Sequence, residues 1–223
     1  MYSIIGAGIA GLSCSISLTE KNIAHEIFDK YSKNSPKAYG IQISPNASNI
    51  LRKLGVLEKI IPLMHKIETI KLISAKDEKL LTSLPIGKFS RERYHSDYYT
   101  ADRNILHESL RNLAEENKTP IKYNSEITST CVSEENVSIS INKNITHLTN
   151  TIILSSGINS QSLYPDTKKI LRKKSKFRAF RATLNNNKIA LKLERDTVNV
   201  WLGNSMHLVA YPIGADVFNF VLI

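Results

Sequence analysis

The chain has 223 residues, of which 42% are hydrophobic and 22% are charged. That composition excludes a disordered chain, and the length allows one or two globular domains. Two cysteines are too few for a disulfide framework, so we expect a reducing compartment, the cytoplasm. The formal net charge of +10 leaves nucleic acids, membrane surfaces and anionic ligands to be considered as partners.

The densest basic segment lies in the last third of the chain. Its cations are Lys168, Lys169, Arg172, Lys173, Lys174, Lys176, Arg178 and Arg181. Because no recognised nucleic-acid-binding module surrounds them, we interpret the segment as a solvated loop leading into a strand and expect no nucleic-acid partner. The sequence also lacks an apolar run of about 20 residues, so we expect no transmembrane segment.

The N-terminal segment predicts a βαβ unit. Tyr2–Ile5 is a short apolar strand, Ile9–Lys21 has the spacing of an amphipathic helix, and His25–Phe28 is a second strand. Strand, glycine turn, helix and strand in this order imply a parallel sheet and an α/β fold.

The rest of the chain predicts two helices and two groups of strands. Pro45–Leu57 and Ala101–Asn117 are the predicted helices. The first group of strands is predicted at Glu68–Ser74, Lys79–Leu84, Ile121–Tyr123, Ser125–Val132, Val137–Ile141 and His147–Leu154. The second group, expected to be antiparallel, is Ala179–Leu184, Val198–Leu202, His207–Tyr211 and Val217–Ile223.

A glycine motif occupies the turn of the βαβ unit. Gly6, Gly8 and Gly11 form G-x-G-x-x-G between the first strand and the helix, and Asp29 ends the second strand. The first glycine permits a tight turn, the second permits close approach of a pyrophosphate, and the third permits close packing of helix and strand. With an acid placed to bind ribose hydroxyls, the context predicts a dinucleotide site. The alternative is a glycine turn with a purely structural role.

Two later segments carry a resemblance to a known family. They are Gly40-Ile41-Gln42-Ile43-Ser44-Pro45-Asn46-Ala47, followed by a helix with Leu51 and Leu54-Gly55, and Asp102-Arg103-Asn104-Ile105-Leu106. Together with the glycine motif, this succession resembles the FAD-dependent aromatic-ring hydroxylases, flavoprotein monooxygenases such as the para-hydroxybenzoate, salicylate and ubiquinone-pathway hydroxylases. The resemblance implies FAD as cofactor, NADH or NADPH as reductant, and a small aromatic substrate.

The resemblance also implies roles for individual residues. Gln42 would lie on the flavin side, Arg103 would contact FAD, Asp29 would hold the adenosine ribose, and the backbone of Ile127 would meet the adenine. The whole expected cofactor-binding set is Gly6, Gly8, Ala10, Gly11, Asp29, Lys30, Gln42, Arg103 and Ile127. For Arg103, an ion pair with Asp102 or Glu108 at the start of the helix is the structural alternative.

The C-terminal strands resemble the family's substrate domain. The matching segments are Phe180-Arg181-Ala182-Thr183, Trp201-Leu202-Gly203 and the strand that contains His207 and Tyr211. Alternation places His207 and Tyr211 on one face of that strand, where they would either line a substrate cavity or pack in the sheet. The implied fold is an FAD-binding Rossmann-like domain, residues 1–64 and 101–169, with an inserted mixed-sheet substrate domain, residues 65–100 and 170–223.

Two departures from the family pattern affect the predicted function. Ser155-Ser156-Gly157 stands where the family has an A-D-G motif, so Ser156 replaces an acid and flavin reduction by nicotinamide is in doubt. The family's later G-D-A-A-H motif is missing, and we expect the chain to be truncated at its C-terminus. The sequence shows no dedicated catalytic acid or base and no set of metal ligands.

The sequence is compatible with three functions. The chain is an FAD-dependent monooxygenase, active alone or completed by a separate C-terminal chain or by self-association. Alternatively, it is an inactive FAD-binding fragment of such an enzyme. As a third possibility, it is a binding module that uses its βαβ unit for another dinucleotide.

Overall fold

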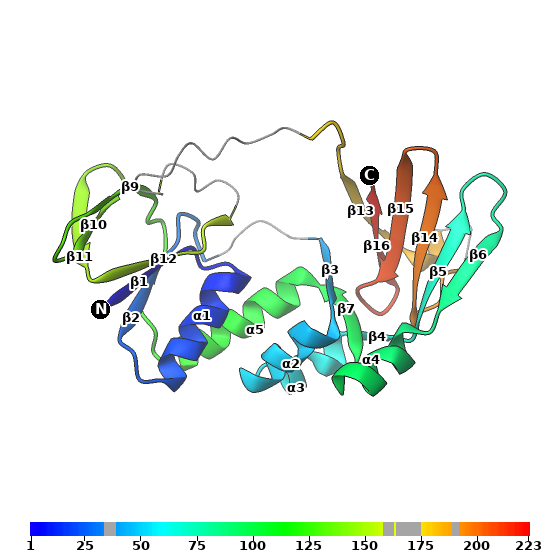
Figure 1. The fold of residues 1–223 in the computed structure, drawn as a ribbon, viewed down its shortest axis with the longest axis horizontal. Coiled ribbons are helices and arrows are strands. Elements are labelled where there is room, and N and C mark those ends of the chain that lie inside the picture. The colour runs from blue at the N-terminus through cyan, green and yellow to red at the C-terminus, as the bar shows by residue number, and fades with distance from the viewer. Residues whose placement is uncertain (34–38, 158–162, 164–174, 189–191) are drawn as a thin grey trace. The chain divides into compact units, whose positions relative to one another are not determined.

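A computed structural model describes residues 1–33, 39–157, 163, 175–188 and 192–223 (Figure 1). The chain divides into two compact units: unit 1, residues 1–36 and 107–173, and unit 2, residues 37–106 and 174–223. These bounds differ from the predicted domain bounds, because residues 37–64 and 101–106 cluster with unit 2. The difference arises from the pairing of strands, described below.

Unit 1 is built on a four-stranded parallel sheet of order β12-β1-β2-β8. The N-terminal βαβ unit is confirmed as β1 (Tyr2–Ile5), α1 (Ile9–Glu20) and β2 (His25–Phe28). The outer strands are β8 (Ile121–Lys122) and β12 (Thr151–Leu154), and both run parallel to their neighbours. The predicted parallel sheet and α/β class are therefore confirmed.

A second, antiparallel sheet packs against the parallel sheet of unit 1. Its strands are β9 (Ile127–Val132), β10 (Val137–Ile141) and β11 (Ile145–Thr149), in the order β11-β10-β9. Ile5 and Phe28, which are register partners in β1 and β2, share one hydrophobic cluster with Ile139 of β10. Ile4 and Ile27 are fully buried, and alternation directs them to the opposite face of the sheet.

The predicted strand His147–Leu154 is wrong, because this segment forms two strands in different sheets. β11 ends at Thr149 and β12 begins at Thr151. At the junction the Asn150 N–H donates to the Met1 carbonyl at 3.2 Å, and the Thr149 hydroxyl donates to the same carbonyl at 2.8 Å. These bonds bring the chain from one sheet into register beside β1 in the other. Periodicity does not reveal such a change of sheet, since both strands alternate alike.

Unit 2 contains a six-stranded mixed sheet and a three-stranded antiparallel sheet. The mixed sheet has the order β13-β16-β15-β14-β5-β6, with β14 and β5 parallel and the other pairs antiparallel. Its strands are β5 (Thr69–Ser74), β6 (Leu80–Leu84), β13 (Phe180–Asn185), β14 (Thr197–Gly203), β15 (Met206–Pro212) and β16 (Val217–Leu222). The predicted antiparallel C-terminal strands are confirmed to within two residues.

The three-stranded sheet explains why the unit bounds differ from the predicted domains. β7 (Tyr98–Asp102) lies between β3 (Gly40–Ile43) and β4 (His65–Ile67) and is antiparallel to both. Residues 40–43 are thereby tied to 98–102 and not to the βαβ unit. The helix predicted from Ala101 is corrected to α5 (Arg103–Glu116), since Ala101 and Asp102 belong to β7.

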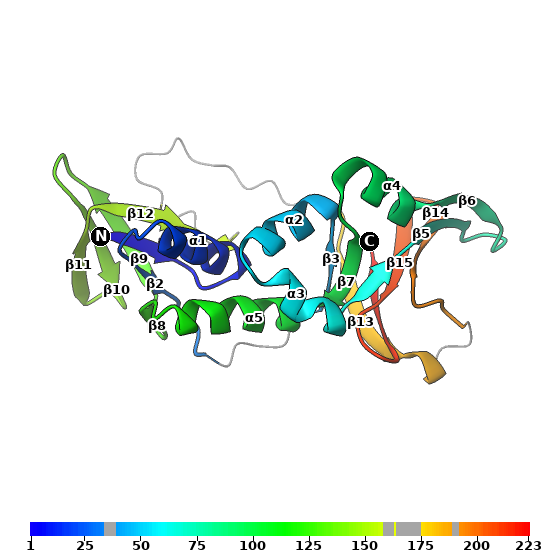
Figure 2. The same cartoon turned by 90° about the horizontal axis from the view of Figure 1, so that it is seen from below.

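The remaining helices of unit 2 differ in part from the prediction. The helix predicted over Pro45–Leu57 ends at Lys53 as α2 (Pro45–Lys53), and Gly55 follows with φ +69°, a left-handed conformation that stops a helix. The sequence analysis missed α4 (Ile86–Tyr94), which packs against α2, β4, β5 and β7 (Figure 2). Short helical turns complete the unit at α3 (Leu57–Ile60), η1 (Ile61–Leu63) and η4 (Asn186–Lys188).

In the described part of the chain, no helix is both long enough and apolar enough to cross a membrane. Most of the predicted basic loop, residues 164–174, lies outside the described residues. Of its cations, Lys176, Arg178 and Arg181 are described and exposed, and Arg181 lies in β13.

Candidate cofactor site

The glycine turn of unit 1 is held by backbone packing that leaves no room for side chains at two of its glycines. Gly6 has φ +107°, and a Cβ there would lie 2.7 Å from the Ser155 carbonyl oxygen. A Cβ on Gly11 would lie 1.9 Å from the Gly6 carbonyl oxygen. Gly6 therefore permits the turn and Gly11 permits α1 to approach it, as the motif predicts.

Gly8 is different, because the structure does not need a glycine there for its own packing. It is the N-cap of α1, with φ −76°, and a Cβ would meet no atom within 4 Å. No side chain caps the helix at this residue. The space beside Gly8 is therefore open at the N-terminal end of α1, where the unpaired N–H groups of a helix favour an anionic group such as a phosphate.

Two side chains hold the peptide groups on either side of Ala7. The Asp29 carboxylate accepts a hydrogen bond from the Ala7 N–H at 2.6 Å and another from the Tyr31 N–H at 2.8 Å. His107 of α5 lies with its Nε2 2.7 Å from the Ala7 carbonyl oxygen. Asp29 was expected only to bind ribose, and the sequence analysis missed His107, since a helical histidine 100 residues away carries no signal of this contact.

Ser155 closes the other side of the turn. Its hydroxyl lies 3.0 Å from both the Ile5 and the Gly6 carbonyl oxygens, and its N–H donates to Ile5 at 2.9 Å. Next to it, the buried Ser156 hydroxyl has no hydrogen-bond partner among the described residues. The residue that replaces the family's acid thus lies directly beside the turn, with a buried hydroxyl that lacks a partner in the described part of the chain.

These features fit the adenosine diphosphate half of a dinucleotide. Gly8 and the start of α1 would receive the phosphates, and each Asp29 oxygen keeps a second lone pair for a ribose hydroxyl. Ala10, in the first turn of α1, and Lys30, which follows Asp29, are both exposed, and Lys30 Nζ lies 5.0 Å from the Tyr31 ring centroid. Ile127 is 7% exposed at the start of β9, so any contact to adenine would come from its backbone.

The other two expected cofactor residues, Gln42 and Arg103, belong to unit 2. The Tyr98 hydroxyl donates to Gln42 Oε1 at 2.6 Å, and burial raises the pKa of Tyr98, which keeps this phenol a donor. Arg103 begins α5 with an exposed side chain, and its N–H donates to the Tyr39 carbonyl at 3.1 Å. Among the described residues, no ion pair joins Arg103 to Asp102 or Glu108, and Asp102 instead accepts from the Asn104 N–H at 2.8 Å.

His207 and Tyr211 lie on β15 in unit 2. His207 is half-buried opposite Leu202 of β14. Tyr211 is 4% exposed and packs in a cluster with Ile67, Val198 and Ile213. Burial is the main reason that the pKa of Tyr211 is raised to about 12. The phenol therefore remains protonated at neutral pH, and its ring has at least a packing role.

Comparison with known proteins identifies relatives over most of the chain. Residues 2–152 match the family described as FAD binding domain. The chain is 26% identical over 217 residues to the 3-amino-4-hydroxybenzoate 2-monooxygenase PtnB3 of Streptomyces platensis, covering 95% of this chain and 52% of that protein. It is 22% identical to the 3-hydroxybenzoate 6-hydroxylase of Polaromonas naphthalenivorans, covering 98% and 55%. The chain thus spans about half the length of the curated relatives it matches.

Solved structures share the fold. Klebsiella pneumoniae HpxO in complex with FAD and uric acid matches with a TM-score of 0.80 at 17% identity, over 100% of this chain and 56% of that one. CtdE in complex with FAD and a substrate matches with a TM-score of 0.83 at 17% identity, over 99% and 56%. At this identity the likeness establishes the fold of both units.

Proposed function

Because the chain belongs to the FAD binding domain family, in the flavin-dependent aromatic hydroxylase and monooxygenase group, we propose that it holds FAD for the hydroxylation of a small aromatic compound. The observation that carries this proposal is the glycine turn, in which Gly8 alone leaves an open face beside an uncapped helix start. Bound FAD would supply the redox chemistry, and NADH or NADPH would supply the electrons.

The described residues would bind and orient the cofactor. Asp29 and His107 fix the Ala7 peptide groups, so the turn is already formed before a ligand arrives. Gln42, held by Tyr98, and Arg103 are the proposed contacts from unit 2. Asp29 and the N-terminal end of α1 would receive the ribose and phosphates.

The proposed substrate is a hydroxylated aromatic acid. Two of the relatives described above are named for hydroxybenzoates, which makes this the first class to test. His207 and Tyr211 are the proposed contacts, with Tyr211 as a protonated hydrogen-bond donor. The cytoplasm is the proposed location, as expected for a chain with two cysteines, both free.

Two alternatives make different predictions. If the chain is an FAD-binding part without hydroxylase activity, it binds FAD but does not couple reductant and oxygen to product. If it is a module for another dinucleotide, NADH or ADP should bind at least as tightly as FAD.

The experiment is a titration of the purified chain with FAD, ADP and NADH, followed by assays with either reductant and a panel of hydroxybenzoates. The proposal predicts that FAD binds more tightly than ADP, because Gln42 and Arg103 add contacts beyond the adenosine half. It also predicts substrate-dependent oxygen consumption with a hydroxylated product, either by the chain alone or once a complementary C-terminal chain is supplied. Equal affinity for FAD and ADP would contradict the flavin assignment.

Arg103 provides a separate test of the contact from unit 2. Arg103→Ala should weaken FAD binding while leaving ADP affinity and the melting temperature of the ligand-free chain unchanged. This selectivity is expected because the Arg103 side chain is exposed and makes no ion pair with Asp102 or Glu108 in the described part of the chain. A loss of thermal stability without a loss of FAD affinity would return Arg103 to a structural role.

A further inference from the structure

Unit 2 contains a pocket that is lined by none of the individual residues expected to bind cofactor or substrate. Its volume is about 460 Å³, within the range of small-molecule sites. It is lined by Pro45 and Asn46 of α2, by Phe89, Ser90 and Tyr94 of α4, and by Tyr98 of β7, all within unit 2. Sequence patterns gave no indication of this pocket, because α4 was not predicted.

Aromatic side chains form much of the pocket wall. Phe89 is 49% exposed and Tyr94 is 42% exposed, and their ring centroids lie 6.1 Å apart in an edge-to-face arrangement. The two neighbouring rings give the pocket an exposed apolar wall. A flat apolar ring is the ligand group that such walls would bind.

Ser90 lines the pocket and carries a hydroxyl group. Its side chain is fully buried, yet its hydroxyl has no hydrogen-bond partner among the described residues. A buried hydroxyl left unpaired costs about 1–3 kcal/mol. A ligand with a hydrogen-bond acceptor would satisfy it.

The start of α2 adds positive potential to the same pocket. Ser44 is the N-cap of this nine-residue helix but makes no side-chain cap, because its hydroxyl donates to Asn46 Oδ1 at 2.5 Å. The N–H groups of Asn46 and Ala47 have no acceptor within the helix, and they lie at the positive end of its dipole. An anionic acceptor is therefore favoured over a neutral one.

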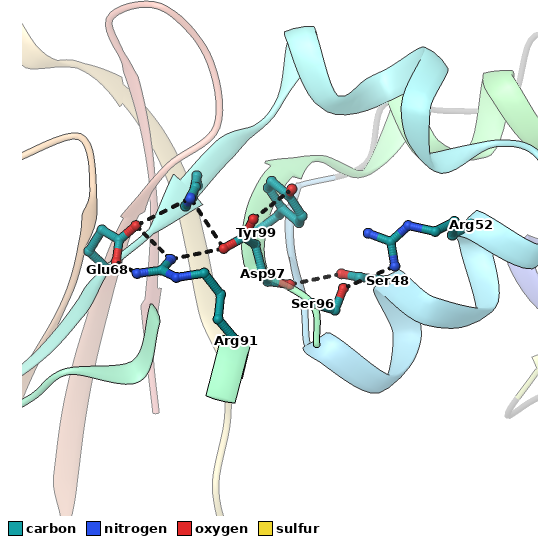
Figure 3. A network of polar contacts seen from close by, with 8 residues as sticks. Ser48, Arg52, Glu68, Arg91, Ser96, Asp97 and Tyr99 are labelled. Atoms are coloured by element: carbon teal, nitrogen blue, oxygen red, sulfur yellow. Dashed lines mark hydrogen bonds and ion pairs between the residues drawn. The ribbon is translucent and has the colours of Figure 1, made fainter. Parts of the chain in front are cut away.

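The surrounding charges agree with this preference. The Arg93 guanidinium lies 5.9 Å from the centroid of the Tyr94 ring, which lines the pocket. The nearby carboxylates of Glu68 and Asp97 are already paired with Arg91, as Figure 3 shows. Lys66 pairs with the same two carboxylates, so two cations balance their two negative charges, and Arg93 lies beside the Tyr94 ring.

We propose that this pocket binds a small aryl carboxylate, with its ring against Phe89 and Tyr94 and its carboxylate at the first turn of α2, near Ser90. None of the pocket-lining residues belongs to the glycine turn, and neither His207 nor Tyr211 lines the pocket, although Ile86 and Tyr98 also pack against the cluster that contains Tyr211. Because Tyr98 lines the pocket and donates to Gln42 at 2.6 Å, occupancy of the pocket would also restrict the side chain of Gln42.

The test is isothermal titration of the full chain with naphthoate as the probe and with its methyl ester as the neutral control. The expected result is one binding site with a Kd of about 1 mM or lower, and much weaker binding of the ester. Phe89→Ala and Ser90→Ala should each weaken naphthoate binding about fivefold, the loss expected for one aromatic contact or one hydrogen bond. Phe180→Ala, which removes an exposed ring from β13, should leave naphthoate binding unchanged.

Absence of saturable binding, equal binding of the ester, or full affinity in Phe89→Ala would overturn the proposal. Gly8→Val separates it from the proposed function, since that substitution changes only the glycine turn of unit 1. The variant should lose FAD and ADP binding and keep naphthoate binding. Loss of naphthoate binding in folded Gly8→Val would place the probe at the dinucleotide site and contradict a separate pocket.

Discussion

The glycine turn of unit 1 and the anchorage of α4 in unit 2 are held in opposite ways. In the turn, backbone atoms lie so close together that a single methyl group at Gly11 would sit 1.9 Å from a carbonyl oxygen. At α4, the Arg91 guanidinium donates two hydrogen bonds of 2.9 Å to Glu68 and a third to the half-buried Asp97 (Figure 3). We therefore expect added side-chain bulk to disrupt the turn at any ionic strength. The contribution of the Arg91 ion pairs that hold α4 should instead fall when a charge is removed or screened.

The largest effect is expected from Gly11→Val. A valine there cannot fit between α1 and the Gly6 carbonyl, so the helix must move away from the sheet. We expect a loss of about 3 kcal/mol in unfolding free energy. That corresponds to a fall in melting temperature of roughly 6–12 °C, measured by circular dichroism. An unchanged melting temperature would show that the packing at Gly11 is looser than the structure has it.

An intermediate effect is expected from His107→Ala, which removes the side chain that holds the Ala7 carbonyl. Loss of one hydrogen bond should cost about 1 kcal/mol and should also weaken ADP binding, because the turn is no longer fixed before the ligand arrives. His95→Ala, at the exposed end of α4, is the matched control and should leave ADP binding unchanged. Equal ADP affinity in wild type and His107→Ala would remove His107 from the site.

A further effect should appear as pH dependence at α4. Hydrogen bonding to Arg91 is the main cause that lowers the pKa of Glu68 below its ordinary 4.5, and the pKa of Asp97 is lowered too, because Arg91 and Lys66 outweigh its burial. Carboxylates with depressed pKa values stabilise the folded state above their unfolded-state pKa. That stabilisation is lost as the pH falls through the folded-state pKa. When unfolding is monitored from neutral to acid pH, the unfolding free energy of Arg91→Met should fall less than that of wild type. Identical curves would contradict the assignment.

The smallest effect is expected from Arg91→Met at neutral pH. The ion pairs of Arg91 are exposed, and exposed pairs add little to stability. Salt should reduce that small contribution further in wild type, so the difference between wild type and Arg91→Met should shrink in high salt. A difference that persisted in high salt would mean that packing of the arginine stem, and not charge, holds α4.

The same contrast explains which parts of the molecule were predictable. Tyr2–Ile5, the glycine motif and His25–Phe28 are local in sequence, and their strand, turn and helix signals agree with one another. The α4 segment carries Gly87 and charged side chains at helical positions, and its place depends on Glu68, between β4 and β5, and on Asp97, just before β7. His107 and Ser155 contact the turn only because the fold brings residues about 100 and 150 positions away to it.

Gly8 gives the most direct test of the central claim, that the glycine turn exists to receive a dinucleotide and not merely to fold. Because a Cβ at Gly8 meets no protein atom within 4 Å, Gly8→Val should fold with a melting temperature close to that of wild type. The added side chain would occupy the space beside the α1 N-terminus, so affinity for FAD and for ADP should fall at least about tenfold, which is about 1.4 kcal/mol. FAD binding by folded Gly8→Val as tight as that of wild type would contradict the account.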